Sequence, residues 1–297
     1  IYIMAIKVGK ESVEGSFKLY KGIGAFNIIA VNPNKKELES ILGRDLDKDP
    51  EYISKTEDGK DTIRVTFYAK TNKDSKVNNG IELVTPINFT ITKAIRIGAN
   101  TGKTLIIDKY GRTAWATQEE LTNKSIPMYS SGPANIDKGY RPCCIGEDSL
   151  IDFLIQWLNI PNPAEYKDGK WIMKKDPSDS EVSLDLNKLF KNDMSELKEV
   201  IKIASTFLVK GAVGIKTTDE GKQYQAVFTR KFVKNAITDY SRLDSAIKDF
   251  QNNGGAPNTE FDCTPLHENV IEATNFSSEA PSDLPFESGD TAPWFGK

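Results

Sequence analysis

The sequence has a single histidine, His267, among its 297 residues. Histidine is a frequent general base and metal ligand, so mechanisms and metal sites that depend on it have no basis in the body of the chain. The three cysteines, Cys143, Cys144 and Cys263, lack the paired spacing of a zinc site and are too few and too uneven for a disulfide framework. These shortages predict a protein that is not an enzyme, holds no metal or other cofactor, and works in a reducing cytoplasm.

Long hydrophobic runs are also missing. No apolar stretch reaches the length that a transmembrane helix needs, and the residues around Met4 do not show the charged leader and cleavage site of a signal peptide. We therefore expect no membrane partner.

Two short segments imitate ligand-binding loops but fail on spacing. In the segment from Gly98 to Thr104, three residues separate the glycines where a phosphate-binding loop has four, and the apolar run that follows predicts a strand rather than a helix. The acids Asp45, Asp47 and Asp49 resemble the start of a calcium loop, but Pro50 stands where that loop needs glycine. We predict a hairpin turn at the first segment and no metal site at the second.

Charge is distributed unevenly along the chain. Of 42 acidic and 39 basic residues, positions 257–297 hold eight acids and one base, so residues 1–256 keep 34 acids and 38 bases and a net charge of about +4. The acidic segment also carries isolated aromatic anchors and too little apolar surface to fold alone, which predicts a flexible interaction tail over residues 256–297. A solvated terminus without a partner is the alternative.

The body alternates between strand and helix patterns. Strands are predicted at 17–20, 26–31, 63–70, 82–97, 103–107, 112–116, 207–216 and 222–232, with turns at 21–24 and 218–221. Helices are predicted over 35–42, capped by Asn34 and Gly43, over 150–158 with Trp157 in the core, over 194–204 and over 240–250. In the strand over 63–70, the odd-numbered residues are expected to face the core and Arg64, Thr66, Tyr68 and Lys70 to face outward.

This order predicts a mixed α+β, β-rich fold. Strands, a helical insertion at about 146–205 and a closing hairpin fit an OB-type Greek-key barrel over residues 1–255, although a sandwich fits nearly as well.

The remaining signal is a set of cations beside aromatic rings on predicted strands and loops. Proteins that hold single strands without reading sequence combine a basic groove with exposed rings on which bases stack. The candidate DNA-binding residues are Lys18, Tyr20, Arg64, Tyr68, Lys70, Lys109, Tyr110, Arg112, Trp115, Tyr140, Arg141, Tyr224, Arg230 and Lys231. Each ring is also a candidate core residue, because burying aromatic surface stabilises a fold.

Three stretches resemble phage-encoded single-stranded DNA-binding proteins. They are Leu105–Trp115, the segment from Gly139 through Pro142 and Gly146–Glu147 to Ile160, and the tail element Asp283, Leu284, Pro285 and Phe286, which eleven residues including Trp294 and Phe295 follow. The resemblance implies an OB-type core without the structural zinc of some relatives, coating of exposed strands in DNA replication and recombination in the host cytoplasm, and recruitment of replication or recombination proteins by the tail.

The main alternative is a phage virion or cargo component that uses the same body and tail for protein contacts; a nucleotide-processing enzyme is a third reading. The sequence leaves open the oligomeric state, DNA versus RNA preference, site size and tail partner.

Overall fold

The computed structural model describes residues 22–71, 84–108, 113–122, 125–127, 133–135, 140–160, 165–174, 181–217, 223–253 and 260–262. They fall into two compact units. The first unit takes its described residues from 1–50, 66–87 and 205–290, and the second from 51–65, 88–204 and 291–297. The predicted acidic tail lies almost wholly outside the described residues.

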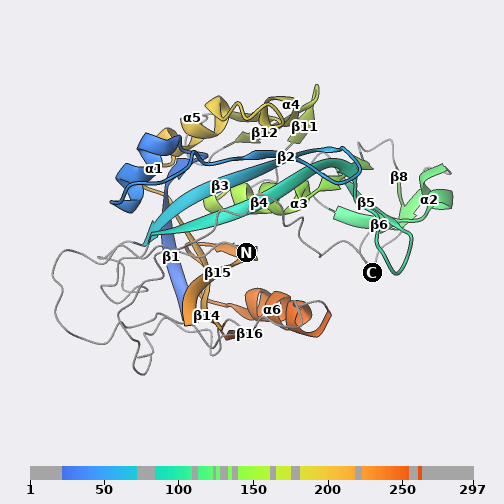
Figure 1. Cartoon of the computed structure of the whole chain (residues 1–297). Coiled ribbons are helices and arrows are strands. Elements are labelled where there is room, and N and C mark those ends of the chain that lie inside the picture. Colours follow the sequence, from blue (N-terminus) through green and yellow to red (C-terminus); the bar gives the residue numbers. More distant parts are fainter. Residues whose placement is uncertain are drawn as a thin grey trace. The chain divides into compact units, whose positions relative to one another are not determined.

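The helices and strands are labelled in Figure 1. The helices are α1 (Lys35–Leu42), α2 (Gln118–Thr122), α3 (Glu147–Trp157), α4 (Leu186–Leu189), α5 (Ser195–Ile203) and α6 (Ser241–Asn253). The strands are β1 (Gly22–Val31), β2 (Ile53–Lys55), β3 (Asp61–Thr71), β4 (Val84–Ile95), β5 (Thr104–Ile107), β6 (Thr113–Ala116), β7 (Ser125–Pro127), β8 (Pro133–Asn135), β9 (Arg141–Pro142), β10 (Cys144–Ile145), β11 (Glu165–Lys167), β12 (Lys170–Lys174), β13 (Glu181–Asp185), β14 (Leu208–Thr217), β15 (Gln223–Lys234) and β16 (Glu260–Asp262). The predicted fold class is confirmed at this level: the protein is mixed α and β, rich in strands, with a curled antiparallel sheet. None of the described helices is long and apolar enough to cross a membrane.

Helix α1 shows how local sequence sets an element. The Asn34 side chain accepts a hydrogen bond from the Glu37 backbone N–H at 3.0 Å, and the Glu37 carboxylate accepts one from the Asn34 N–H at 2.9 Å. This capping box satisfies donors that the first turn leaves open. Gly43 ends the helix in the left-handed conformation, with φ of 68°. Both predicted boundaries are confirmed.

The first unit is built on strands in the order β4, β3, β1, β14, β15, with β16 paired to β14. Helix α6 covers one part of this sheet, where Leu243 and Ile247 pack with Ile23, Ala212 and Phe228 (Figure 1). Helix α1 covers another part, where Leu38 packs with Tyr68 and Val84. The predicted strands near 207–216 and 222–232 and the predicted terminal helix are confirmed as β14, β15 and α6.

The turn predicted at residues 21–24 is wrong from Gly22 onward. Gly22 to Gly24 belong to β1 and pair with β14, Gly24 lying opposite Gly211. A Cβ on Gly24 would lie 2.8 Å from the Phe26 ring and 2.9 Å from the Val213 side chain. Glycine here makes room for neighbouring side chains within a sheet, which is a recognised reason for glycine in a strand.

The second unit contains the strand order β10, β4, β3, β2 and the smaller sheets β6-β5-β9, β11-β12-β13 and β7-β8. Its core is centred on α3, whose apolar residues Leu150, Phe153, Leu154 and Trp157 are buried, as predicted for Trp157. Phe153 packs against Phe89 of β4, with ring centroids 5.0 Å apart. The predicted hairpin turn at Gly98 is confirmed, because the Gly98 N–H donates to the Lys103 carbonyl before β5 begins.

The predicted helical insertion over 146–205 also contains three strands, β11 to β13. Asp168 and Gly169 connect β11 to β12 with φ of 51° and 82°. An Asp-Gly pair with positive φ is the commonest two-residue hairpin turn, and Trp171 and Met173 then alternate into the core. The prediction missed this signal.

Candidate functional site

Several predicted site residues lie outside the described part of the chain. They are Lys18, Tyr20, Lys109, Tyr110, Arg112, Asp283, Leu284, Pro285, Phe286, Trp294 and Phe295. Tyr224 lies in β15, opposite Lys216 of β14, but its side chain is not described.

Two predicted stacking rings are buried. Tyr68 is 9% exposed and packs with Leu38 of α1, so the predicted outward face of β3 is wrong at this residue. Tyr140 is 8% exposed and packs with Ile106 and Ala116. Helix α1 packs against the first ring, and residues of β5, β6 and α2 pack around the second, so neither ring can serve as a stacking platform.

The predicted cations occupy three different settings. Arg64 and Lys70 are half-buried on β3, and Lys231 is half-buried on β15. Arg230 is exposed, and its guanidinium lies 4.4 Å from the centroid of the Phe250 ring on α6. Arg141 is engaged by a buried acid. Of the predicted rings whose side chains are described, only Trp115 is exposed, at 40%.

Two consecutive acids, Glu147 and Asp148, open helix α3. Gly146 precedes them with φ of 81°, and a Cβ at this position would lie 2.0 Å from the Thr90 carbonyl oxygen of β4. Only glycine fits both the left-handed backbone and this close approach. Gly146 therefore determines where the helix starts and so where both carboxylates lie.

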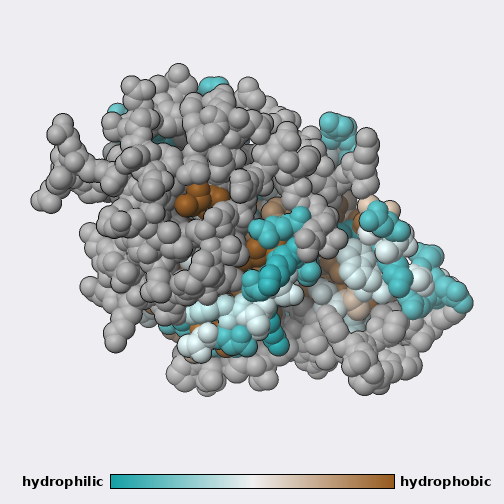
Figure 2. Space-filling model, turned by 90° about the horizontal axis from the view of Figure 1, so that it is seen from below, coloured by the Kyte–Doolittle hydropathy of each residue, from teal (hydrophilic) through white to brown (hydrophobic). Residues whose placement is uncertain are grey.

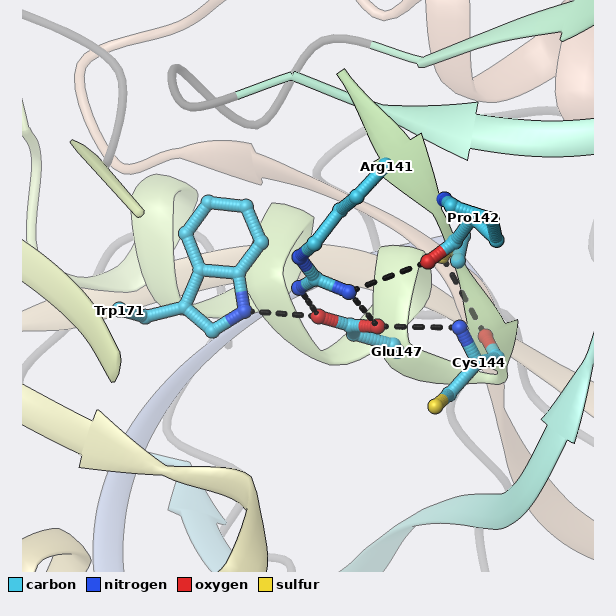
Figure 3. A network of polar contacts seen from close by, with 6 residues as sticks. Arg141, Pro142, Cys144, Glu147 and Trp171 are labelled. Atoms are coloured by element: carbon cyan, nitrogen blue, oxygen red, sulfur yellow. Dashed lines mark hydrogen bonds and ion pairs between the residues drawn. The ribbon is translucent and has the colours of Figure 1, made fainter. Parts of the chain in front are cut away.

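Glu147 is the centre of a buried network (Figure 3). Its carboxylate is fully buried and accepts hydrogen bonds from both terminal nitrogens of Arg141, from the Cys144 backbone N–H at 3.0 Å and from Trp171 Nε1 at 2.8 Å. The Arg141 guanidinium also donates to the Pro142 carbonyl and lies 3.9 Å from the centroid of the Tyr166 ring. The network joins β9, β10, α3 and the β11–β12 hairpin.

The electrostatics of this network are those of a structural ion pair. Burial alone would lower the pKa of Arg141, but its hydrogen bond to Glu147 and the charge of that residue raise the pKa above its usual value. Burial and the neighbouring acids raise the pKa of the Cys143 thiol, so it stays protonated and unreactive. We conclude that Arg141, predicted to bind DNA, instead stabilises the fold of the second unit.

The next acid, Asp148, pairs with Arg96 at the end of β4. Nη1 of Arg96 donates to both carboxylate oxygens, at 3.1 and 2.9 Å. The other two guanidinium nitrogens have no partner among the described residues. The guanidinium lies 5.9 Å from the centroid of the Trp115 ring on β6, within range of a cation–π interaction. This pair is more exposed than the Arg141 pair, with Arg96 34% and Asp148 23% exposed, against 23% for Arg141 and 0% for Glu147.

Backbone pairing fixes Arg96 and Trp115 in place. The Arg96 N–H donates to the Cys143 carbonyl and the Arg96 carbonyl accepts from the Leu105 N–H, while Leu105 lies directly opposite Trp115 in the β5–β6 pair. The Trp115 ring passes over Gly98, where a Cβ would lie 3.3 Å from the indole. Arg96 and Gly98 are two residues apart on an extended segment and so face the same side, toward Trp115.

The surroundings of this site contain both signs of charge. Glu120 of α2 is held in a capping box with Thr117, and the hydrogen bond from the Thr117 N–H lowers the pKa of Glu120. Lys103, in the Gly98 turn, lowers that pKa further through its charge. Among the described residues, Arg96 and Lys103 bring positive charge to this end of the β5–β6 hairpin, and the Glu120 carboxylate already accepts a hydrogen bond from the Thr117 N–H.

Ile95 and Ile97 flank Arg96 and are 54% and 61% exposed. They alternate with Arg96 and so face away from the Trp115 side of the segment. In the view of Figure 2, some small hydrophobic areas of the described residues lie beside hydrophilic side chains.

Sequence reasoning found Trp115 but missed Arg96, Asp148 and Glu147 as partners. A usable signal was present for the acids, because two carboxylates directly after a glycine at a helix start are placed together by the helix geometry. A weaker signal marked Arg96, the only cation among the residues that alternate into the Gly98 turn.

Comparisons of the chain with protein-family models, with curated proteins and with solved structures each returned no match.

Proposed function

We propose that this protein binds single-stranded DNA without acting on it chemically. The observation that carries the proposal is the pairing of exposed Trp115 with Arg96, whose guanidinium lies 5.9 Å from the ring and keeps two nitrogens without a partner among the described residues. A base stacked on the indole gains about 1–3 kcal/mol, and a phosphate accepts charge-assisted hydrogen bonds from arginine.

Fewer side chains support this proposal than the sequence predicted for a DNA-binding groove. Tyr68 of the first unit and Tyr140 of the second are buried, and Arg141 is paired with the buried Glu147. In the second unit, Trp115, Arg96 and Lys103 are the side chains on which the proposal rests. The net charge of about +4 on residues 1–256 favours a polyanionic partner. The wider proposal is an OB-type, phage-encoded protein that coats exposed strands in replication and recombination and recruits partner proteins through Asp283–Phe286 and Trp294–Phe295 of its acidic tail.

The test is a fluorescence anisotropy titration of labelled oligo-dT with the full chain and two variants. Trp115→Ala and Arg96→Ala are expected to weaken binding by about 1–3 kcal/mol each. Matched controls are Ile237→Ala, which removes another exposed apolar side chain, and Arg242→Ala, which removes an exposed cation from α6. Absence of oligo-dT binding by the full chain would overturn the proposal, and equal affinities for all four variants would overturn the assignment of the site.

The tail provides a second test. The eight acids of residues 257–297 are expected to compete with DNA for the cations of the body, so a chain ending at Gly255 should bind oligo-dT more tightly at low salt. Unchanged or weaker affinity would remove the competitor role while leaving the strand-binding proposal intact.

A second candidate function is supported by Ile95 and Ile97. Exposed isoleucines beside each other on a strand end suit a protein contact, as a virion or cargo component would require. Copurification with assembled particles that is lost in an Ile95→Ser/Ile97→Ser variant, together with no affinity for oligo-dT, would favour this function over DNA binding.

A further inference from the structure

We propose that Asp148 is a positioning residue for the Trp115–Arg96 site: its carboxylate holds Arg96 beside the exposed indole ring and leaves two guanidinium nitrogens for a phosphate of the bound strand. The inference rests on the proposed function and adds to it a residue that does not itself touch the strand.

The geometry of the pair supports this role. Both carboxylate oxygens of Asp148 accept from the same nitrogen, Nη1 of Arg96, rather than from two nitrogens side by side. In the usual bidentate arrangement an arginine spends two of its nitrogens on one carboxylate. Here Nε and Nη2 remain without a partner among the described residues.

Asp148 is a rigid support for this purpose. It lies in the first turn of α3, whose start Gly146 determines, and its side chain is only 23% exposed. Burial raises the pKa of Asp148, and the charge of Arg96 lowers it only in part. Arginine loses much side-chain conformational entropy when a ligand fixes it, so an arginine that is already held by a rigid acid binds a phosphate at lower entropic cost.

Simple electrostatics predicts the opposite effect of Asp148. A carboxylate close to the path of a polyanion repels it, so removing the charge without any positioning role would tighten binding. Positioning through Arg96 predicts that removing the charge weakens binding. The sign of the effect therefore separates the two roles.

The experiment measures the Kd for labelled oligo-dT of the full chain with Asp148→Asn, in the wild-type and in the Arg96→Gln background. We expect about a fivefold weaker Kd in the wild-type background, a fraction of the strength of one charge-assisted hydrogen bond. In the Arg96→Gln background the same change is expected to leave Kd unchanged or slightly tighter. Asp152→Asn, which removes the same charge one turn later on α3, is the matched control and is expected to tighten binding slightly or not at all.

A second readout needs no DNA. With 5-fluorotryptophan incorporated, the ¹⁹F resonance of Trp115, assigned by Trp115→Phe, is expected to shift in Asp148→Asn and to stay in place in Asp152→Asn. Asp148→Glu keeps the charge and is expected to restore part of the affinity; it replaces Asp148→Asn if that variant does not fold, with a smaller loss of affinity expected.

The outcomes separate the two proposals. Tighter or unchanged binding by folded Asp148→Asn, while Arg96→Gln weakens binding, would overturn the positioning role and leave the proposed function standing. A wild-type chain that does not bind oligo-dT would overturn the proposed function, and the ¹⁹F resonance would then still decide whether Asp148 holds the surroundings of Trp115. An unchanged resonance in Asp148→Asn would overturn the positioning role.

Discussion

Two arginines in the second unit, Arg141 and Arg96, have similar neighbours but different roles. Each lies near an aromatic ring and each pairs with one of the consecutive acids that open α3. Glu147 is fully buried and collects four donors, whereas Asp148 remains partly exposed and binds a single nitrogen of Arg96. The comparison teaches that a cation beside a ring is a fold element when a buried acid holds both of its terminal nitrogens, and a candidate binding site when its ion pair is partly exposed and one terminal nitrogen is left over.

The largest expected effect belongs to the buried pair. Glu147→Gln removes the charge that compensates a largely enclosed guanidinium and is expected to lower the free energy of unfolding by about 4 kcal/mol. Urea denaturation of the full chain measures it. Glu199→Gln, which changes an exposed partner of Lys202, is the control and is expected to leave stability almost unchanged. A loss at Glu147 no larger than at Glu199 would mean that the two arginine pairs do not differ in the way described.

The glycine that positions both acids gives the next largest effect. Gly146→Ala forces a Cβ against the Thr90 carbonyl in a left-handed backbone, and we expect a loss of about 3 kcal/mol in stability together with weaker oligo-dT binding. Gly59→Ala is the matched control, because Gly59 has φ of 79° but open space around it. The control is expected to cost about 1 kcal/mol and to leave DNA binding unchanged. Equal losses for the two variants would show that the contact with Thr90 is not what requires glycine at position 146.

Helix ends could be predicted from the sequence, whereas the exposure of strand residues could not. The ends of α1 follow from Asn34 and Gly43 because capping depends on neighbouring residues alone. Whether a ring on a strand is exposed depends on what the rest of the chain places over it, and α1 covers Tyr68 although alternation turned that residue outward. Alternation defines two faces of a strand but does not tell which of them is covered.

The same limit applied to the site. Trp115 was identified as a candidate ring, but its partner Arg96 comes from a strand about twenty residues earlier and Asp148 from a helix farther along. These three residues are brought together by strand pairing, here by the backbone hydrogen bonds that Arg96 makes with Cys143 and Leu105. The β11–β12 hairpin was different, since Asp168 and Gly169 carried a local turn signal that the prediction did not use.

The exposed arginine has a measurable electrostatic signature. In a series of oligo-dT titrations at rising salt, Arg96→Ala is expected to reduce the slope of log K against log salt by about 0.7, the loss of one phosphate contact to a single strand. Arg242→Ala, a cation of the other unit, is expected to leave the slope nearly unchanged. If the slope were the same for the wild type and Arg96→Ala, Arg96 would make no phosphate contact and would, like Arg141, serve only to stabilise the fold.

The smallest expected effect concerns pH. Burial raises the pKa of Asp148 in the folded chain, so the folded state takes up this proton at a higher pH than the unfolded state does. Protonation of Asp148 therefore stabilises the folded state at a pH below the ordinary aspartate pKa, and this contribution is lost as pH rises through the raised pKa of the folded state. Relative to Asp148→Asn, the wild type should therefore gain stability as pH falls from 7 to 4. Urea denaturation at several pH values measures the difference, and a wild type that instead gains on the alkaline side would contradict the assigned shift.

Photo-crosslinking of the full chain to oligo-dT, followed by tryptic digestion and mass spectrometry, tests the central claim most directly. Cleavage places Trp115 in the peptide Thr113–Lys124 and the buried Trp171 in the separate peptide Trp171–Lys174. A nucleotide adduct on Thr113–Lys124, absent from Trp171–Lys174, is the predicted result. Adducts confined to other peptides, with Thr113–Lys124 unmodified, would contradict the assignment of Trp115 as a stacking platform.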